Sequence, residues 1–167
     1  MILEVKPQDT LIGFRLEPWS KSLRRRIVSH PKFYLFDLGV INGLTRQLTV
    51  PPDPMRAGRL FEQFIILETY RMLNYLQSEA SLYFWRTNHG AEVDLVIEKH
   101  GRITGAFEIK SVSQVTGYHL SGLRSFHQEY PDVSLHVIAL VENPYRLDEA
   151  LVMPWKMYLE NINKYLL

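Results

Sequence analysis

The stretch EVDLVIEKHGRITGAFEIK, residues 92–110, decides the fold of this chain. Polar and apolar residues alternate at 92–95 and at 107–110, within the strand-like runs 92–98 and 103–111 that the turn-forming residues 99–102 separate. Alternation with a period of two is typical of strands, and a short turn between two such runs favours an antiparallel pair. The run at 82–87 ends in the turn Asn-His-Gly, so we expect it to be the first strand of a three-stranded meander.

The same alternation predicts the face that each side chain takes, because successive side chains on a strand point to opposite faces. We expect Glu92 and Asp94 to share one face of the first strand of the hairpin. The opposite face then takes the apolar residues Val93, Leu95 and Ile97.

In the second strand of the hairpin, Glu108 and Lys110 are expected to share a face, while Phe107 and Ile109 point the other way. Pairing through the turn would then place Asp94 across from Glu108. The sequence therefore predicts two carboxylates and one ammonium group close together near the end of a sheet.

This arrangement suits a hard divalent cation, because Mg²⁺ prefers oxygen ligands, usually one or two carboxylates, and keeps several waters. Asp94, Glu108 and the carbonyl of Ile109 are the predicted ligands. Lys110 would orient or help to deprotonate a bound water, or neutralise charge on a phosphate. The alternative is a cross-strand ion pair of Lys110 with one of the carboxylates, which in exposed positions contributes roughly 0–1 kcal/mol.

A long helical pattern precedes the meander. Apolar residues recur at helical spacing over residues 57–77, and Asp53 followed by Pro54 is a typical helix start. Glu62 lies one turn into this helix, where it could project towards the carboxylates of the sheet. Glu68 competes with it for that position, and a glutamate in the first turn is also favoured by the helix dipole.

The remaining patterns complete an α/β prediction. The core order of helix, three strands, helix and strand implies a mixed central sheet flanked by helices, in which a crossover helix makes the last strand parallel to the one before it. The other expected elements are strands at 10–16, 32–37 and 134–141, helices at 39–44 and 118–129, and a helix at the end of residues 148–167.

Composition excludes several classes of protein. The 167 residues carry a net charge of +1 and no cysteine, which excludes disulfides and thiolate chemistry. Residues 1–61 have an excess of basic residues, whereas residues 62–167 have an excess of acidic ones. The densest basic stretch is either a phosphate-binding patch or a solvated segment, and consists of Lys21, Arg24, Arg25 and Arg26.

Several familiar motifs are absent from the sequence. It has no Walker-type phosphate loop, nucleophile elbow, HExxH zinc motif or dinucleotide fingerprint, and its histidines lack metal-ligand spacing. It also has no apolar run of the ~18–20 residues that a membrane helix needs, and no signal-peptide layout. We expect a cytoplasmic protein without membrane contact.

The spacing GxxxE on a helix, then Asp on a strand and ExK on the next strand, resembles the PD-(D/E)XK nuclease superfamily. More specifically, the chain resembles the C-terminal domain of unknown function that follows the ATPase module in prokaryotic AAA-type ATPases. The stretches that carry this resemblance are KFYLFDLG (32–39), GRLFEQF (58–64), YFWR (83–86), EVDLV (92–96), FEIKS (107–111) and MPW (153–155).

This resemblance implies a restriction-endonuclease-like core over residues 57–167, on which strands and a linker in residues 1–56 pack. It implies a nuclease dependent on Mg²⁺ or Mn²⁺, in which Asp94, Glu108 and Lys110 act together with Glu62. The substrate would be DNA or RNA, and the possible partners are DNA, an ATPase module and a second copy of the chain. The ATPase module of that family is not in the sequence, so the chain resembles a fragment that lacks it.

Three further side chains are candidates for contact with nucleic acid. Arg86, next to Trp85, could pair with a phosphate while the indole stacks on a base, although an aromatic residue on a strand is more often part of the core. His89 lies in the turn before Asp94, and Arg124 follows on the next helix with His119. For these residues the alternative is a solvated turn or helix face.

Two other interpretations remain open. The fold could be a catalytically silent module that docks to DNA or to an ATPase, or a remnant whose carboxylates form only ion pairs. A docking module would expose an apolar surface in its N-terminal segment, which a second copy of the chain could also cover. The candidates for that surface are Leu11, Ile12, Phe14 and Trp19.

Overall fold

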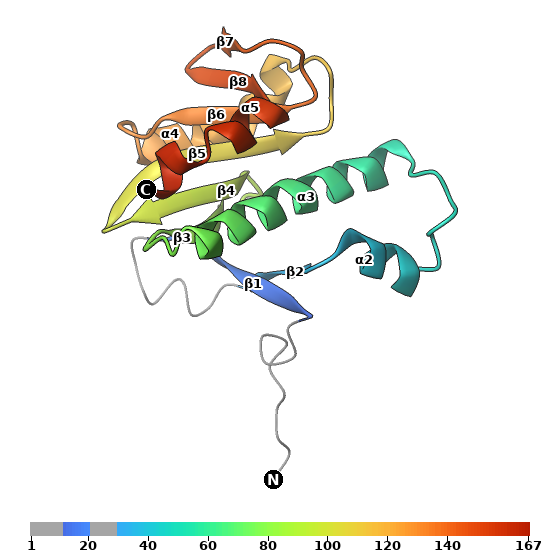
Figure 1. Ribbon diagram of the computed structural model, residues 1–167. Coiled ribbons are helices and arrows are strands. Elements are labelled where there is room, and N and C mark those ends of the chain that lie inside the picture. Colours follow the sequence, from blue (N-terminus) through green and yellow to red (C-terminus); the bar gives the residue numbers. More distant parts are fainter. Residues whose placement is uncertain (1–11, 21–29) are drawn as a thin grey trace.

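The computed structural model describes residues 12–20 and 30–167, and shows a single mixed sheet with helices on both faces (Figure 1). The strands are β1 (Gly13–Pro18), β2 (Lys32–Leu35), β3 (Ser81–Arg86), β4 (Glu92–Lys99), β5 (Arg102–Lys110), β6 (Leu135–Ala139), β7 (Tyr145–Leu147) and β8 (Ala150–Pro154). The α-helices are α2 (Leu38–Leu44), α3 (Pro54–Tyr75), α4 (Ser121–Glu129), α5 (Trp155–Glu160) and α6 (Asn163–Leu166), and a 3₁₀ turn, η1 (Gly117–Leu120), precedes α4.

The eight strands follow the order β2-β1-β3-β4-β5-β6-β8-β7. Strands β3, β4 and β5 form an antiparallel meander, and β6 runs parallel to β5 after the crossover through α4. The predicted mixed α/β class is therefore confirmed. Helices α3, α5 and α6 cover one face of the sheet around the buried Ile65, Tyr158 and Leu166, and α4 covers the other with Leu123 and Phe126.

Helix α3 begins where its sequence signals place it. The Asp53 side chain accepts a hydrogen bond of 2.8 Å from the Arg56 amide, and Pro54 occupies the first helical position. This capping satisfies one of the donors that a helix start leaves open. The helix ends at Tyr75, two residues before the predicted end.

The predicted faces of β4 need one correction. Leu95 and Ile97 face α3, but Val93 packs on the α4 side together with Val96. The reason is a change of register, because Tyr83 pairs with Val96 while Trp85 pairs with Val93. Strand β4 therefore has one more residue than β3 in this interval, which is a β-bulge, and strict alternation fails at that point.

The C-terminal segment also differs from its prediction. It ends in helices as expected, but a hairpin of β7 and β8 comes first, and β8 runs parallel to β6. Strand β7 has only three residues, which is too short for a periodic signal. Asp148 turns the hairpin with a φ of 51°, a value that Asp tolerates better than most residues.

At the N-terminus, β1 pairs in parallel with β3, and β2 pairs with β1, so both belong to the main sheet. Phe14 is 5% exposed and stacks on Tyr70 at 4.0 Å between ring centroids. It therefore cannot contribute to an exposed docking surface, whereas Ile12 is exposed.

The division of the chain at residues 56 and 57 stays a prediction. Leu11 and the basic residues Lys21, Arg24, Arg25 and Arg26 lie outside the described residues.

No helix among the described residues combines the length and the apolar character that crossing a membrane requires.

Candidate functional site

The strands β4 and β5 bring Asp94, Glu108 and Lys110 together, and we call these three residues the carboxylate–lysine cluster. Lys110 Nζ lies 2.5 Å from Glu108 Oε1 and 3.5 Å from Asp94 Oδ2. Asp94 Oδ2 also accepts a hydrogen bond of 2.8 Å from the Ile109 amide. Both carboxyl groups are only 7% exposed, so the cluster is a buried group of titratable side chains rather than a surface ion pair.

The β-bulge in β4 positions Asp94. Between the paired residues Val93 and Val96, Asp94 and Leu95 both lie opposite the single residue Phe84 of β3. Bulges of this kind redirect a side chain and are over-represented beside active sites. Here the bulge lets Asp94 meet Lys110 while its neighbour Leu95 stays in the core.

Burial dominates the electrostatics of the two carboxyl groups. Burial raises the pKa of Asp94. Lys110 partly lowers that pKa again, and Glu62 raises it further. Burial and the neighbouring Asp94 raise the pKa of Glu108 to about 8. For Lys110, burial lowers the pKa, but Asp94 and Glu108 outweigh that effect and hold it above the ordinary value. Perturbed titrations grouped in this way are typical of functional sites.

One oxygen of the cluster is left without a partner. Glu108 Oε2 is buried and makes no hydrogen bond, although a buried carboxylate oxygen normally has one. Helix α4 lies directly above it, because Gly122 approaches β4 so closely that a Cβ there would lie 1.8 Å from the Glu92 carbonyl oxygen and 3.4 Å from Glu108 Oε2. A bound cation would supply the partner that this Glu108 oxygen lacks.

The described residues limit the number of side chains that could bind such a cation. Among residues 12–20 and 30–167, no three His, Cys, Asp or Glu side chains gather closely enough to hold a metal ion. Mg²⁺ nevertheless binds in many proteins through one or two carboxylates and completes its shell with waters. Asp94 and Glu108 supply the two carboxylates of that smaller ligand set.

A second group of charges lies beside the cluster, and its lysine comes from β2. Lys32 Nζ lies 3.2 Å from Glu62 Oε1 and also pairs with Glu92, which Arg86 contacts from its other side. The Tyr34 hydroxyl donates a hydrogen bond of 2.8 Å to Glu62 Oε1. We call Lys32, Tyr34, Glu62 and Glu92 the β2 network.

The β2 network is electrostatically connected to the cluster. Glu62 raises and Lys32 lowers the pKa of Asp94. For Lys32 itself, burial lowers the pKa, but Glu62 and Asp94 outweigh it and the net shift is upward. Burial and Glu62 both raise the pKa of Tyr34, so its hydroxyl keeps the proton that it donates.

The structure separates the two candidate glutamates of α3. Glu62 joins the β2 network, whereas Glu68, six residues later in the same helix, pairs with Arg71 at 2.5 Å. Lys32 and Tyr34 were not predicted as site residues. Their alternation with Phe33 and Leu35 indicates that they share a face, but nothing local in the sequence reveals that this face meets Glu62.

The other predicted contact residues are dispersed. Arg86 is exposed and pairs with Glu92 beside the cluster, and His89 is exposed in the turn before β4. Arg124 is engaged elsewhere, because it pairs with Asp148 and donates to the Gly117 carbonyl at 2.9 Å.

Trp85 is 4% exposed and packs on Phe126, so it offers no stacking surface. His119 Nδ1 accepts from the Thr116 amide as a cap for η1.

Comparison with known proteins gives a family without an assigned activity. The family model described as a domain of unknown function, DUF4143, matches residues 57–158, which include Glu62 and the whole cluster. Uncharacterized proteins from Mycobacterium bovis and Mycobacterium tuberculosis are each 31% identical to this chain over 150 residues. The alignments cover 86% of this chain and 32% of each relative, so the chain spans about a third of their length. No solved structure matches the chain.

Proposed function

We propose that this chain, which belongs to the DUF4143 family, is a nuclease-type domain that uses Mg²⁺ or Mn²⁺ to hydrolyse phosphodiester bonds of nucleic acid. The observation that carries the proposal is the carboxylate–lysine cluster, in which a buried Glu108 oxygen has no hydrogen-bond partner. In a purely structural ion pair a buried carboxylate oxygen normally also has a hydrogen-bond partner, whereas Lys110 contacts only Oε1 here and Oε2 has none.

The order of elements supports the proposal. Helix α3, the antiparallel strands β3, β4 and β5, the crossover helix α4 and the parallel strand β6 follow one another as in the core of PD-(D/E)XK nucleases. In that superfamily the Asp and the ExK motif lie on adjacent strands, as Asp94 and Glu108 do here. Because fold does not imply activity, the weight of the proposal rests on the site.

Each residue of the site would have a distinct role. Asp94, Glu108 and the carbonyl of Ile109 would hold the cation, which when bound polarises a phosphate and lowers the pKa of a coordinated water. Lys110 has a raised pKa and therefore stays an ammonium, which suits it to neutralise charge on a phosphate rather than to remove a proton. Glu62, fixed by Lys32 and Tyr34, would support the site from α3.

The test is a titration with Mn²⁺ by calorimetry, followed by a cleavage assay with labelled DNA and RNA. Asp94→Asn is expected to lose saturable Mn²⁺ binding and cleavage while keeping its fold, because the amide preserves the shape of the side chain. Asp148→Asn is the matched control, since Asp148 is exposed and paired only with Arg124 among the contacts described. Cleavage that survives in Asp94→Asn would refute the proposal.

The partners of the domain are also proposed. Arg86 and His89 lie exposed at the same end of β3 and β4 as Asp94, where they would contact the phosphates of DNA. The mycobacterial relatives are about three times as long as the aligned segment. From the resemblance to the C-terminal domain of AAA-type ATPases we also propose that the domain works as part of a longer protein with an ATPase module.

A second candidate function, a silent interaction module, is favoured by the surface around α2. This helix buries none of its residues, and Arg56 holds the loop after it through the Gln47 and Val50 carbonyls. The exposed apolar side chains of this segment are Val40, Leu44, Leu48, Val50 and Met55. We propose that these side chains form a docking patch, because exposed apolar patches mark interaction sites.

Analytical ultracentrifugation tests the interaction module. If this surface pairs with a second copy of the chain, dimers are expected at high protein concentration and are expected to disappear in Leu44→Gln with Leu48→Gln. A protein that stays monomeric and cleaves nucleic acid would exclude the silent module in favour of the nuclease.

A further inference from the structure

A pocket of about 600 Å³ lies at the same edge of the sheet as the carboxylate–lysine cluster. Lys110, Ala139 and Pro154 are register partners at the ends of β5, β6 and β8, so these three strands finish side by side. At the ~4.8 Å that separates neighbouring strands, Pro154 lies about 10 Å from Lys110 along this edge. The pocket is formed by the segments that follow β6 and β8, and it therefore adjoins the proposed site.

The walls of the pocket are mostly apolar. Leu140 is 43% exposed, and its amide donates a hydrogen bond of 3.0 Å to the carbonyl of Val112, two residues after Lys110. Phe64 of α3 holds Trp155 in place, with 5.5 Å between the ring centroids and an angle of 79° between the rings. The apolar side chains that line the pocket are Leu140, Val141, Pro144, Pro154, Trp155 and Met157.

One cation and one carboxylate complete the lining. Lys156 Nζ lies 5.6 Å from the centre of the Trp155 ring, and the ammonium group has no acidic partner among the described residues. Glu142 is exposed and forms no ion pair with any residue that the structure describes. The ammonium group attracts a phosphate, whereas a carboxylate repels it and accepts hydrogen bonds from the amino groups of bases. A nucleotide would therefore place its phosphate at Lys156 and its base towards Glu142.

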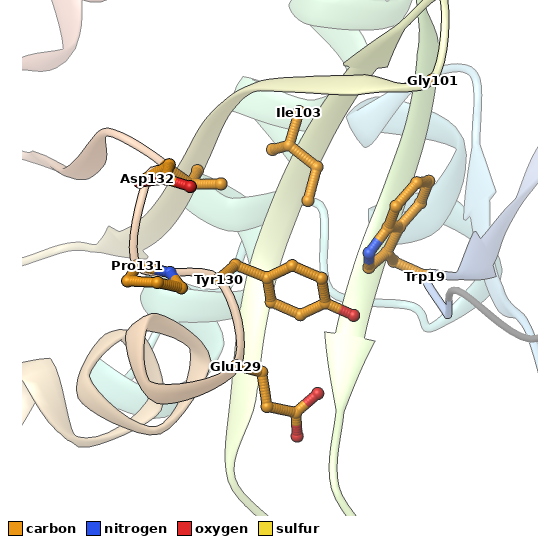
Figure 2. A pocket seen from close by; sticks show the side chains of 8 residues that line it. Trp19, Gly101, Ile103, Glu129, Tyr130, Pro131 and Asp132 are labelled. Carbon is orange, nitrogen blue, oxygen red and sulfur yellow. The ribbon is translucent and has the colours of Figure 1, made fainter.

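The other end of the β4–β5 hairpin offers no comparable place for a phosphate. A pocket of about 380 Å³ lies there, beside Gly101 in the turn of the hairpin (Figure 2). Glu129 and Asp132 line it, and no lysine or arginine among the described residues does so. A phosphate is therefore repelled at that end and attracted at the edge that carries Lys156.

These features select a nucleotide whose base is unpaired. Apolar and aromatic walls hold the bases of single strands with little regard to sequence, because every base has a π face. A base within a duplex is stacked and paired, and it must leave the helix to enter such a pocket. We propose that the pocket formed by Leu140, Pro154, Trp155 and Lys156 binds one unpaired nucleotide of the strand that the cluster cuts. This inference rests on the proposed nuclease function, and it makes single-stranded nucleic acid the preferred substrate.

The test measures binding of a short fluorescein-labelled DNA strand to the full chain by fluorescence anisotropy, with Ca²⁺ in place of Mn²⁺. The control probes are the duplex of the same sequence and a strand of the same length that carries only abasic nucleotides. We expect saturable binding of the single strand and at least tenfold weaker binding of both controls, because neither offers an unpaired base. Equal binding of the single strand and either control, or no binding of the single strand, would overturn the proposal.

Variants locate the nucleotide in the pocket. Lys156→Gln is expected to weaken binding of the single strand at least fivefold, and to lower the slope of log affinity against log salt concentration by about 0.7, as for one phosphate contact. Lys164→Gln, at an exposed position of α6, is the matched control and should change neither value. Undiminished binding by Lys156→Gln contradicts the proposal.

A second variant tests the apolar wall. Leu140→Glu is expected to weaken binding of the single strand at least tenfold, because it places a carboxylate in the pocket, and circular dichroism shows whether the fold is kept. Unchanged affinity in the folded variant would exclude a nucleotide at this wall. A free nucleoside monophosphate that competes as well as the strand would show a small-molecule ligand, and would overturn the assignment to a strand.

Failure of this inference is distinguishable from failure of the nuclease proposal. Mn²⁺ binding by calorimetry is expected to be the same in Lys156→Gln and the wild type, since Lys156 is not part of the cluster. A wild type that cleaves single and double strands equally well would overturn the inference and leave the nuclease intact. A wild type that binds the single strand through Lys156 and cleaves nothing would refute the nuclease, and would support a binding site for unpaired nucleotides.

Discussion

At the scale of single residues, Glu108 connects the chemistry of the site to the stability of the protein. Its carboxyl group is buried beside Asp94, and its pKa of about 8 means that the metal-free protein holds a proton there at neutral pH. In the unfolded chain the same group has a pKa near 4.5, so folding is accompanied by proton uptake over the interval between these values.

The buried Glu108 carboxyl group makes the stability of the folded protein depend on pH. Between about pH 4.5 and 8 the folded state binds more protons at Glu108 than the unfolded state, so this group makes the free energy of unfolding fall as pH rises. We expect the wild type to lose on the order of a few kcal/mol relative to Glu108→Gln over that range, because glutamine stays neutral. Urea unfolding of both proteins at pH 5, 6.5 and 8 measures the difference, and a constant difference would contradict the assignment.

Lys32 is expected to matter more for stability than its place on an edge strand indicates. Lys32→Met should lower the free energy of unfolding by about 1–2 kcal/mol, because Glu62 and Glu92 lose a shared cationic partner while partly buried. Lys164→Met, at an exposed position of α6, is expected to change it by less than about 0.5 kcal/mol. Equal urea midpoints for the two variants would show that the β2 network contributes nothing.

At the scale of elements, the sequence predicts what depends on local pattern and misses what depends on distant partners. Asp53 with Pro54 predicts the start of α3, and the alternation around Phe107 predicts β5, because both signals lie within a few residues. The bulge at Asp94 escapes prediction, since it exists only in the register between β4 and β3. The role of Lys32 cannot be predicted locally either, because its partner Glu62 is 30 residues away in the sequence.

The contact between α4 and β4 provides a test at this scale. Gly122→Ala is expected to cost roughly 2–3 kcal/mol, because its Cβ would overlap the Glu92 carbonyl and push α4 away from Glu108. Gly58→Ala is the matched control within α3, where the new Cβ would meet Ser111 Oγ at an ordinary 3.5 Å. It should be neutral or stabilise by roughly 0.5–1 kcal/mol, since alanine is the better helix former. Thermal unfolding of both variants decides, and a harmless Gly122→Ala would contradict the close approach.

At the scale of the whole molecule, the sheet is one continuous layer that extends beyond the segment matched by the family model. Strands β1 and β2 lie outside residues 57–158, yet Phe14, Leu16 and Tyr34 are buried in the same core as α3. Helix α6 also lies outside that segment and contributes the buried Leu166. The matched segment is therefore the recognisable part of a larger folding unit.

A chain shortened to residues 57–158 tests this unity. We expect it to lack a cooperative thermal transition, because it loses two strands of the sheet and leaves the inner faces of β3 and α3 exposed to water. Circular dichroism during heating, compared with the full chain, measures the outcome. A sharp transition and a dispersed NMR spectrum for the short chain would show that residues 57–158 fold independently.

The extra residue of β4 also makes the site vulnerable to a change in chain length. Deleting one residue between Val93 and Val96 would let β4 match β3 residue for residue, and the sheet could persist while Asp94 lost its place beside Lys110. Substitutions elsewhere in the strand leave that spacing intact. A single-residue alignment gap at this position would therefore distinguish relatives that have lost the site from those that keep it, even where an aspartate remains in the strand.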